Sequence, residues 1–255
     1  MLHSHRITTW LHSRNEQLKH KNAVAQITMD TGQAMAAANI LHDIDVPVKK
    51  ATFGMGCFWG PDTLYGTLKG VIRTRVGYSG GTKINPTYRD LGDHTECIDI
   101  DYDPNEISFE KLLEEFWKNH DPTYRATKQY TSLIFYHDDD QKQTAEKSFK
   151  EEEEKKGKKG KFVTKILPAA EFYNAEDYHQ KYRLQQHTQL VQWLGLTSGK
   201  KLISSHAAAR INGYVVGMGG VQMFEEDISR LGLTPEIADY VRKWVTKYEG
   251  HGMIC

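Results

Sequence analysis

The hydrophobic period of this chain switches repeatedly between two residues and about 3.6 residues, and this switching limits the folds open to it. Residues 95–104, TECIDIDYDP, alternate between two faces as a strand does and close in an Asp-Pro turn. Residues 108–122 follow with apolar side chains at helical spacing behind Ser108, a residue type favoured as an N-cap. Alternating strands and helices predict an α/β fold, here an α+β two-layer sandwich in which helices flank a mixed sheet.

The rest of the chain extends this pattern and sets its limits. Further strands are predicted at 49–56, 71–81, 130–138 and 162–169, and further helices at 57–71, 139–161, 174–195 and 234–248. A glycine-rich break at 212–222 separates the last two helices. We therefore expect one folded domain over 49–200, an N-terminal extension over 1–48, and a C-terminal extension over 201–255 that ends in a mobile arm.

The N-terminal extension is basic and poor in acidic residues. Its first 20 residues also contain four scattered histidines, His3, His5, His12 and His20, without regular metal-ligand spacing. A flexible, solvated tail is the favoured interpretation, and a targeting segment is the alternative. We accordingly expect a cytoplasmic protein, with a mitochondrial or nuclear pool as the alternative.

Charge and cysteine content exclude several function classes. The chain has 33 Lys and Arg against 33 Asp and Glu, so it lacks the net positive charge that attracts nucleic acid or anionic membrane. It has no apolar stretch of the roughly 20 residues that cross a bilayer. Its three cysteines, Cys57, Cys97 and Cys255, form neither a CxxC pair nor a zinc-spaced cluster. We expect no metal and no bound cofactor, and a reducing compartment.

Cys57 lies in the stretch GMGCFWGP, residues 54–61, where the predicted first strand turns into the first helix. Backbone N–H groups and the helix dipole at such a position lower the pKa of a thiol, which raises its thiolate fraction. Gly54 and Gly56 permit a tight turn and a close approach of substrate. A buried core cysteine is the competing interpretation, but the glycines favour a nucleophile.

Six short stretches resemble, in the same order, the motifs of the A-type peptide methionine sulfoxide reductase family. They are GCFWG (56–60), VGYSGG (76–81), DHTECIDIDYDP (93–104), FWKNHDPT (116–123), QYTSLIFY (129–136) and AEDYHQKY (175–182). The similarity covers about residues 49–190, and the C-terminal arm is similar to that of some animal members. A resemblance at six places in register is far more specific than one motif alone.

The resemblance implies an enzyme that reduces methionine-S-sulfoxide, free and in proteins, and so repairs oxidised proteins. It implies that Cys57 is the nucleophile and Glu96, in the HTE motif, the general acid, because burial raises the pKa of a carboxyl. It also implies substrate-binding roles: Tyr78 and Tyr130 on the sulfoxide oxygen, Asp121 organising the pocket, and Phe58 and Trp59 on the methyl group.

Recycling requires a second thiol to reduce the sulfenic acid left on Cys57. Cys97 follows Glu96 on a strand and should face the other way, into the core. We therefore expect Cys255, on the glycine-jointed arm, to resolve the intermediate as a disulfide, which thioredoxin or a small dithiol then reduces. Two departures from the family bear on this: the tail holds one cysteine rather than two, and only YRATK separates Thr123 from Gln129.

Other interpretations stay open at this point. Glu96 could face solvent, the tyrosines could be packing residues, and Asp121-Pro122 could be a simple turn. His94, His120 and His179 are expected to be structural or hydrogen-bonding. A non-enzymatic thiol redox sensor or binding module is the alternative function, and a cysteine hydrolase ranks last because no motif supplies a histidine base. We expect a monomer that binds oxidised proteins, free methionine sulfoxide and thioredoxin, but no nucleic acid or membrane.

Overall fold

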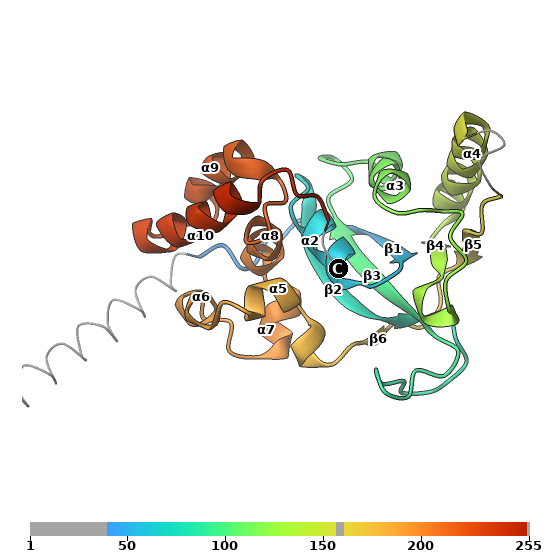
Figure 1. Ribbon diagram of the computed structural model, residues 1–255, viewed down its shortest axis with the longest axis horizontal. Helices are drawn as coiled ribbons and strands as arrows, with labels where there is room; N and C mark the ends of the chain where they lie inside the picture. The colour runs from blue at the N-terminus through green and yellow to red at the C-terminus, as the bar shows by residue number, and fades with distance from the viewer. Residues whose placement is uncertain (1–39, 157–160, 254–255) are drawn as a thin grey trace, which may run out of the picture.

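The computed structural model describes residues 40–156 and 161–253, and a six-stranded mixed sheet lies at its centre (Figure 1). The strands are β1 (Lys49–Met55), β2 (Val71–Ser79), β3 (Thr95–Tyr102), β4 (Ser132–Tyr136), β5 (Lys165–Pro168) and β6 (Tyr173–Asn174). They lie in the order β5-β4-β1-β3-β2-β6, and the β4–β5 pair is the parallel one. The short strand β6 was not predicted from the sequence.

Three helices cover one face of this sheet: α2 (Trp59–Gly66), α3 (Phe109–Lys118) and α4 (Asp139–Lys156). The core between the layers includes Leu64 and Tyr65 from α2, Phe116 from α3, and Ile98 and Ile100 from β3. Each buried side chain of this size contributes about 1.5–3 kcal/mol to stability. The predicted α+β two-layer sandwich on a mixed sheet is confirmed.

Helix α3 shows why the sequence pattern was informative. Ser108 caps it by accepting a hydrogen bond from the backbone N–H of Lys111. Its apolar stripe, which includes Leu112 and Phe116, is buried, and the Phe116 ring lies 5.3 Å from the Phe53 ring of β1. The N-cap and the buried stripe both support the same helix, so this helix could be predicted from its sequence.

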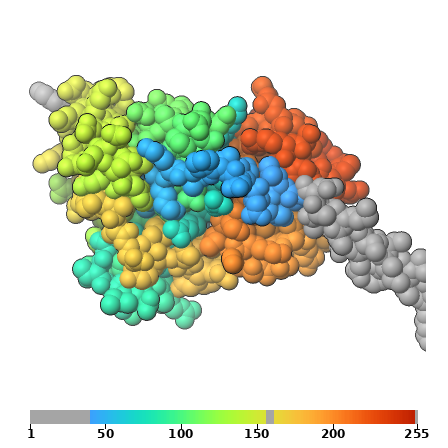
Figure 2. Space-filling model, turned by 180° about the vertical axis from the view of Figure 1, so that it is seen from behind, coloured from blue at the N-terminus to red at the C-terminus, as the bar shows by residue number. Residues whose placement is uncertain are grey.

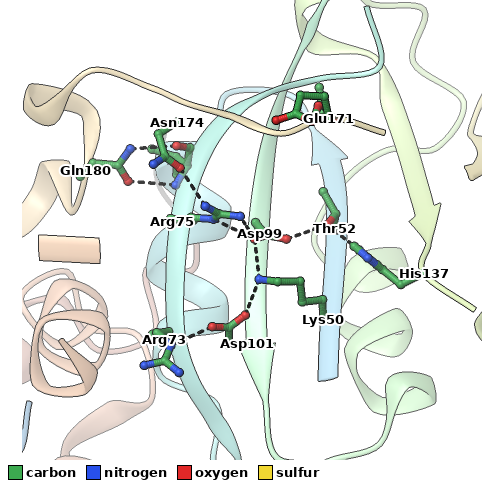
Figure 3. Close-up of polar contacts among 12 residues, drawn as sticks. Lys50, Thr52, Arg73, Arg75, Asp99, Asp101, His137, Glu171, Asn174 and Gln180 are labelled. Carbon is green, nitrogen blue, oxygen red and sulfur yellow. Dashed lines mark hydrogen bonds and ion pairs between the residues drawn. The ribbon is translucent and has the colours of Figure 1, made fainter. Parts of the chain in front are cut away.

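The opposite face of β1, β2 and β3 carries an array of ion pairs (Figure 3). Lys50 of β1 lies 3.2 Å from Asp99 and 2.7 Å from Asp101 on β3. Arg73 of β2 lies 2.7 Å from Asp101, and Arg75 of β2 lies 2.8 Å from Asp99. The three strands are thus cross-linked by side chains in addition to their backbone hydrogen bonds.

A layer of short helices follows the sheet in the sequence. It comprises η2 (Asp177–His179, a 3-10 turn), α5 (Tyr182–Gln185), α6 (Thr188–Trp193), α7 (Gly199–Ser204), α8 (His206–Tyr214), α9 (Gly220–Arg230) and α10 (Pro235–Tyr248). It has its own apolar core, which includes Leu190, Ile211, Phe224 and Val241. The predicted helix over 174–195 is therefore broken into pieces, and α8 and α9 flank the predicted glycine break. Within residues 40–156 and 161–253, no helix is both long and apolar enough to cross a membrane.

Helix α8 packs directly against α2, although it lies beyond the predicted domain boundary at residue 200. The backbone oxygen of Ala209 sits where a side chain on Gly66 would be, which explains a glycine at that helix crossing. The same two helices are also joined by a hydrogen bond from Asn212 of α8 to Asp62 of α2. The other carboxylate oxygen of Asp62 lies 3.0 Å from the Lys181 ammonium. The Lys181 side chain is 0% exposed, so Asp62 is its compensating charge.

Residues 40–48, the last part of the predicted N-terminal extension, lie along this helical layer. Figure 2 shows the segment in blue against the orange helices. Leu41 donates a backbone hydrogen bond to Leu231, and His206 donates one to His42. Ile40 is buried in the helical core. Residues 1–39, with their four histidines, lie outside the described residues.

Candidate active site

Cys57 lies at the junction of β1 and α2, as the sequence predicted. Gly56 turns the chain there with φ +83°, a left-handed conformation that favours glycine. Gly54 serves a different purpose, since a Cβ there would lie 2.7 Å from the carbonyl oxygen of Thr131 on the way into β4. Phe58 is the N-cap of α2, so the half-buried Cys57 precedes the helix by two residues rather than lying in its first turn.

Glu96 points to the same side of the sheet as Cys57 and is 1% exposed, so the alternative that it faces solvent is wrong. Its carboxyl accepts hydrogen bonds from the backbone N–H of Phe58 at 3.1 Å and from the side-chain amide of Gln129 at 2.7 Å. Burial raises the pKa of Glu96, and these two hydrogen bonds only partly oppose that effect. The carboxyl is therefore bound to the peptide group next to Cys57 and is biased toward its protonated form.

A pocket of about 530 Å³ opens beside the thiol. Its lining includes Cys57, Asp121, Tyr130 and, from the short connection between Thr123 and Gln129, Tyr124 and Ala126. The shortened connection thus forms part of the pocket wall. Desolvation raises the pKa of Tyr130 to about 12, with the charge of Glu96 as the next cause, so its hydroxyl keeps its proton. Asp121 lines the pocket and also accepts two hydrogen bonds from Thr123, as a turn aspartate does.

The remaining predicted substrate-binding residues form an aromatic group on the α2 side of Cys57. Phe58 is buried, with its ring 6.0 Å from that of Tyr78. The indole of Trp59 stacks on Tyr182, with ring centroids 3.8 Å apart. The hydroxyl of Tyr78 donates to Glu176 at 2.8 Å, and desolvation is the main cause of its raised pKa. Phe58, Trp59 and Tyr78 are not part of the lining of the 530 Å³ pocket.

The three histidines near the motifs make the hydrogen bonds that the sequence analysis expected of them. His94 accepts from the N–H of Gly81 and contacts the Lys83 carbonyl. His120 bonds to the Phe116 carbonyl and to the Ser132 hydroxyl. His179 accepts from the indole N–H of Trp59 at 3.3 Å.

Sequence reasoning missed Gln129, which binds Glu96, and Glu176, which binds Tyr78. Both residues occur in the quoted motifs, immediately next to Tyr130 and Ala175. Their position inside those motifs was the available signal. Their partners lie 33 and 98 residues away in the chain, so only the folded structure could identify them.

Cys57 and Cys97 lie on opposite sides of the sheet. Cys97 is fully buried on the opposite face from Glu96, against Leu133 and Phe135, and desolvation raises its pKa. Strand alternation predicted this placement. Cys255 lies just beyond the described residues, but Met253 packs against the core cluster that contains Phe58. No group of three or more His, Cys, Asp or Glu residues in 40–156 and 161–253 is arranged to hold a metal ion.

Comparison with known proteins gives one consistent result. A family model described as peptide methionine sulfoxide reductase matches residues 49–210. A Drosophila melanogaster peptide methionine sulfoxide reductase is 48% identical over 217 residues, which is 84% of this chain and 87% of the relative. A Methanosarcina acetivorans MsrA is 43% identical over 179 residues, or 66% of this chain and 90% of the relative.

Solved structures agree with the sequence comparisons. Methionine sulfoxide reductase A of Corynebacterium diphtheriae superposes with a TM-score of 0.50 and 33% identity, covering 56% of this chain and 77% of that one. Reduced Mxr1 from Saccharomyces cerevisiae also gives 0.50, with 31% identity, over 59% of this chain and 91% of the other.

Proposed function

This chain belongs to the peptide methionine sulfoxide reductase family and is an oxidoreductase, and we propose that Cys57, Glu96 and Cys255 carry out its reaction. The substrate is methionine-S-sulfoxide, both free and within oxidised proteins. Each sulfoxide epimer requires its own enzyme, and the motif resemblance indicates the S epimer. The activity repairs oxidised proteins.

In the first step, the Cys57 thiolate attacks at the sulfoxide group while Glu96 delivers a proton to the sulfoxide oxygen. The sulfur–oxygen bond of the substrate breaks and the protonated oxygen passes to the Cys57 sulfur, so methionine is released and Cys57 is oxidised to a sulfenic acid. Tyr130 donates a hydrogen bond to the same oxygen from the pocket wall, because its raised pKa keeps the hydroxyl protonated. We assign the methyl group to Phe58 and Trp59, which follow Cys57 directly although they lie outside the lining of the 530 Å³ pocket. Tyr78, whose hydroxyl donates to Glu176 in this structure, is assigned to the sulfoxide oxygen, and Asp121 organises the pocket.

One observation carries this proposal: the buried Glu96 carboxyl accepts a hydrogen bond from the peptide N–H that directly follows Cys57. The donors that it meets are neutral, a backbone amide and the Gln129 amide. A carboxyl in such surroundings holds a proton at higher pH than a solvated one. The proton donor and the nucleophile are thus held at neighbouring positions.

The second step forms a Cys57–Cys255 disulfide and releases water, and thioredoxin or a small dithiol then reduces the disulfide. The arm that carries Cys255 is anchored where Glu249 accepts a hydrogen bond from Val221. Beyond that anchor, Gly250 and Gly252 have open space around them, and Met253 reaches the cluster around Phe58. The red end of the chain runs back toward the start of α2 (Figure 1). A monomeric state and a cytoplasmic location stay predictions.

A stereospecific assay tests the proposal. Chiral methionine sulfoxide peptides are incubated with the enzyme and with Cys57→Ser, Cys255→Ser and Cys97→Ser variants. Mass spectrometry then follows both the product and the disulfide. We expect no turnover without Cys57, one turnover per enzyme without Cys255 when thioredoxin is the reductant, and full cycling without Cys97. Retained turnover in Cys57→Ser contradicts the mechanism, and oxidation of the enzyme without stereoselective product indicates a redox sensor instead.

A further inference from the structure

The C-terminal arm, which begins at Glu249, leaves α10 beside the start of α9. The Glu249 carboxylate accepts a hydrogen bond at 2.9 Å from the backbone N–H of Val221, in the first turn of α9, where the helix dipole favours a negative charge. A Cβ on Gly220 would lie 2.6 Å from the same oxygen, so the glycine allows this approach. The backbone N–H of His251 then donates to the carbonyl of Tyr248 and closes a turn after the helix. The base of the arm is thus held in place.

The corner between α8 and α9 lies against the C-terminal end of α2. A Cβ on Gly213 or on Gly219 would contact the side chain of Thr67, the C-cap residue of α2. The guanidinium of Arg210 also donates to the carbonyl of Thr67. The arm therefore starts near the end of α2 that is farther from Cys57. Thr67 and Cys57 are ten positions apart, which is about 15 Å along a helix.

The length of the arm is closely matched to this distance. Six residues follow Glu249, and a fully extended segment of six residues spans about 20 Å. The arm therefore has little length to spare if Cys255 is to reach Cys57. Only a narrow range of paths allows this, and holding the arm on such a path costs conformational entropy. A contact partway along the arm would offset that cost.

Met253 makes such a contact. Its side chain is half-buried against the main core cluster, to which α2 contributes Leu64 and Tyr65, and the red end of the chain runs from α10 toward α2 (Figure 1). Cys255 is two residues further along, and two extended residues span about 7 Å. Docking of Met253 thus shortens the free reach from about 20 Å to about 7 Å, so the volume open to the Cys255 thiol falls by up to about twentyfold.

We propose that Glu249 and Met253 are positioning residues that raise the effective concentration of the Cys255 thiol at Cys57. Glu249 holds the base of the arm at the start of α9, and Met253 docks the arm on the core beside α2. The inference rests on the proposed function in one respect, because it takes Cys255 as the resolving thiol.

The step that this placement serves is the attack of the Cys255 thiol on the sulfur of the Cys57 sulfenic acid. The disulfide bond forms as the sulfur–oxygen bond breaks, and the hydroxyl group leaves as water with the proton that the thiol gives up. A slow attack would leave the sulfenic acid open to a further equivalent of peroxide, which oxidises it to the sulfinic acid. A docked arm therefore protects the enzyme as well as speeding its cycle.

The equilibrium between the Cys57–Cys255 disulfide and glutathione measures the effective concentration of the two thiols. The full chain is equilibrated with reduced and oxidised glutathione, alkylated, and analysed by mass spectrometry. The test variants are Glu249→Ala, which removes the acceptor, and Met253→Ser, which removes the apolar contact. Glu249→Gln and Met253→Leu are the conservative variants, because the amide oxygen still accepts and leucine is apolar and similar in volume.

Glu226→Ala is the matched control. Glu226 is an exposed carboxylate on the same helix α9, and its hydrogen bond among the described residues comes from Gln222, one turn earlier, at 3.2 Å. Its removal changes the charge of α9 as Glu249→Ala changes the charge of the arm, but leaves the hydrogen bond to Val221 in place.

We expect the effective concentration to fall about three- to tenfold in Glu249→Ala and in Met253→Ser, as the loss of one hydrogen bond or one apolar contact predicts. It should stay close to the wild-type value in Glu249→Gln, Met253→Leu and Glu226→Ala. An unchanged value in Glu249→Ala or in Met253→Ser overturns the role of that residue. An equal fall in Glu226→Ala overturns the role of Glu249.

Single-turnover kinetics identify the step that is affected. Methionine should form at the wild-type rate in Glu249→Ala and Met253→Ser, because neither residue lines the pocket beside Cys57. The disulfide should form about three- to tenfold more slowly in both variants. Methionine formation that slows by the same factor as disulfide formation would overturn a role confined to the arm.

The glutathione equilibrium also separates this proposal from the proposed function, because it requires the two thiols but no sulfoxide reduction. A lowered effective concentration in variants of a protein that does not reduce methionine-S-sulfoxide would keep the positioning role and refute the function. Unchanged equilibria in variants of an active enzyme would refute the positioning role and keep the function.

Discussion

The carboxyl groups on the two faces of strand β3 have partners of different charge. Glu96 faces the helices, its hydrogen-bond donors among the described residues are two neutral amides, and burial raises its pKa. Asp101, on the other face, meets Lys50 and Arg73, and its pKa is lowered because these ion pairs outweigh the cost of burial. Asp99 beside it binds Lys50, Arg75 and the hydroxyl of Thr52.

The difference shows that burial alone does not decide what a carboxyl does. A carboxyl with cationic partners stays charged and ties strands together, whereas one with only neutral partners can hold and release a proton near neutral pH. Both situations occur within six residues of one strand, so the role of each acid follows from its cross-strand neighbours. The comparison predicts that changes on one face should affect chemistry and changes on the other should affect stability.

The largest expected effect is on the Glu96 side. Replacing Glu96 with Gln keeps the shape and removes the transferable proton, so turnover should fall about 100- to 10,000-fold. Thermal stability at neutral pH should not fall, because a buried carboxyl with a raised pKa is a cost that the amide avoids. Single-turnover kinetics and thermal melting measure the two effects. Near-normal turnover would mean that Glu96 is not the acid.

Asp99→Asn should give the reverse result. The change removes the buried carboxylate that binds Arg75 and one of the two carboxylates that bind Lys50, so unfolding in urea should show a loss of about 2–3 kcal/mol. Turnover under conditions where the variant is folded should stay near that of the wild type, because Asp99 lies on the far face. A loss of turnover comparable to that of Glu96→Gln would break the separation between the two faces.

Gln129→Leu tests whether the hydrogen bond from Gln129 controls the pKa of Glu96. Its hydrogen bond lowers the pKa of Glu96, so removing it should raise that pKa further. Because the protonated carboxyl is the active form, activity declines as the pH rises through this pKa, and the decline should move to higher pH in the variant. Gln141→Leu is the control, since Gln141 bonds the backbone of Lys50 and His137 away from Glu96. Identical pH–rate profiles for both variants would contradict the assignment.

The smallest expected effect is that of Lys50→Met, because Lys50 is partly exposed and its ion pairs are screened by water. We expect a loss of at most about 1 kcal/mol near neutral pH. The lowered pKa of Asp101 gives stability that is present above the ordinary value of 3.8 and is lost as the pH falls through the folded value. Acid unfolding followed by circular dichroism should show a shallower loss in the variant, and a steeper one would reverse the sign.

The sequence was informative where local pattern and tertiary packing agree. Alternation along β3 placed Glu96 and Cys97 on opposite faces, and the stripe of α3 placed Phe116 in the core. It was less informative after β6, where the predicted helix is broken at Lys181, which adopts a left-handed φ of 52°. A lysine is normally read as a surface residue, and nothing local shows that its ammonium binds Asp62 and the carbonyl of Thr74.

The predicted glycine break illustrates the same limit. Gly217 adopts φ +81°, and the backbone of Tyr248 occupies the place of its missing side chain. The glycines between α8 and α9 therefore form a corner over which the end of α10 passes, an arrangement set by a segment about thirty residues further along. Local composition indicated the turn, but not the helix on either side of it.

The enclosed pair of Lys181 and Asp62 has a consequence for anyone who seeks the smallest working fragment of this enzyme. A chain shortened after Gly199 would lose Asn212, which donates to Asp62, and would uncover the flank of α2 that Ala209 closes. Truncation at the domain boundary predicted from the sequence, residue 200, would therefore remove part of the catalytic domain. A minimal version would have to retain α8, or exchange the lysine and the aspartate together for apolar residues of matching volume.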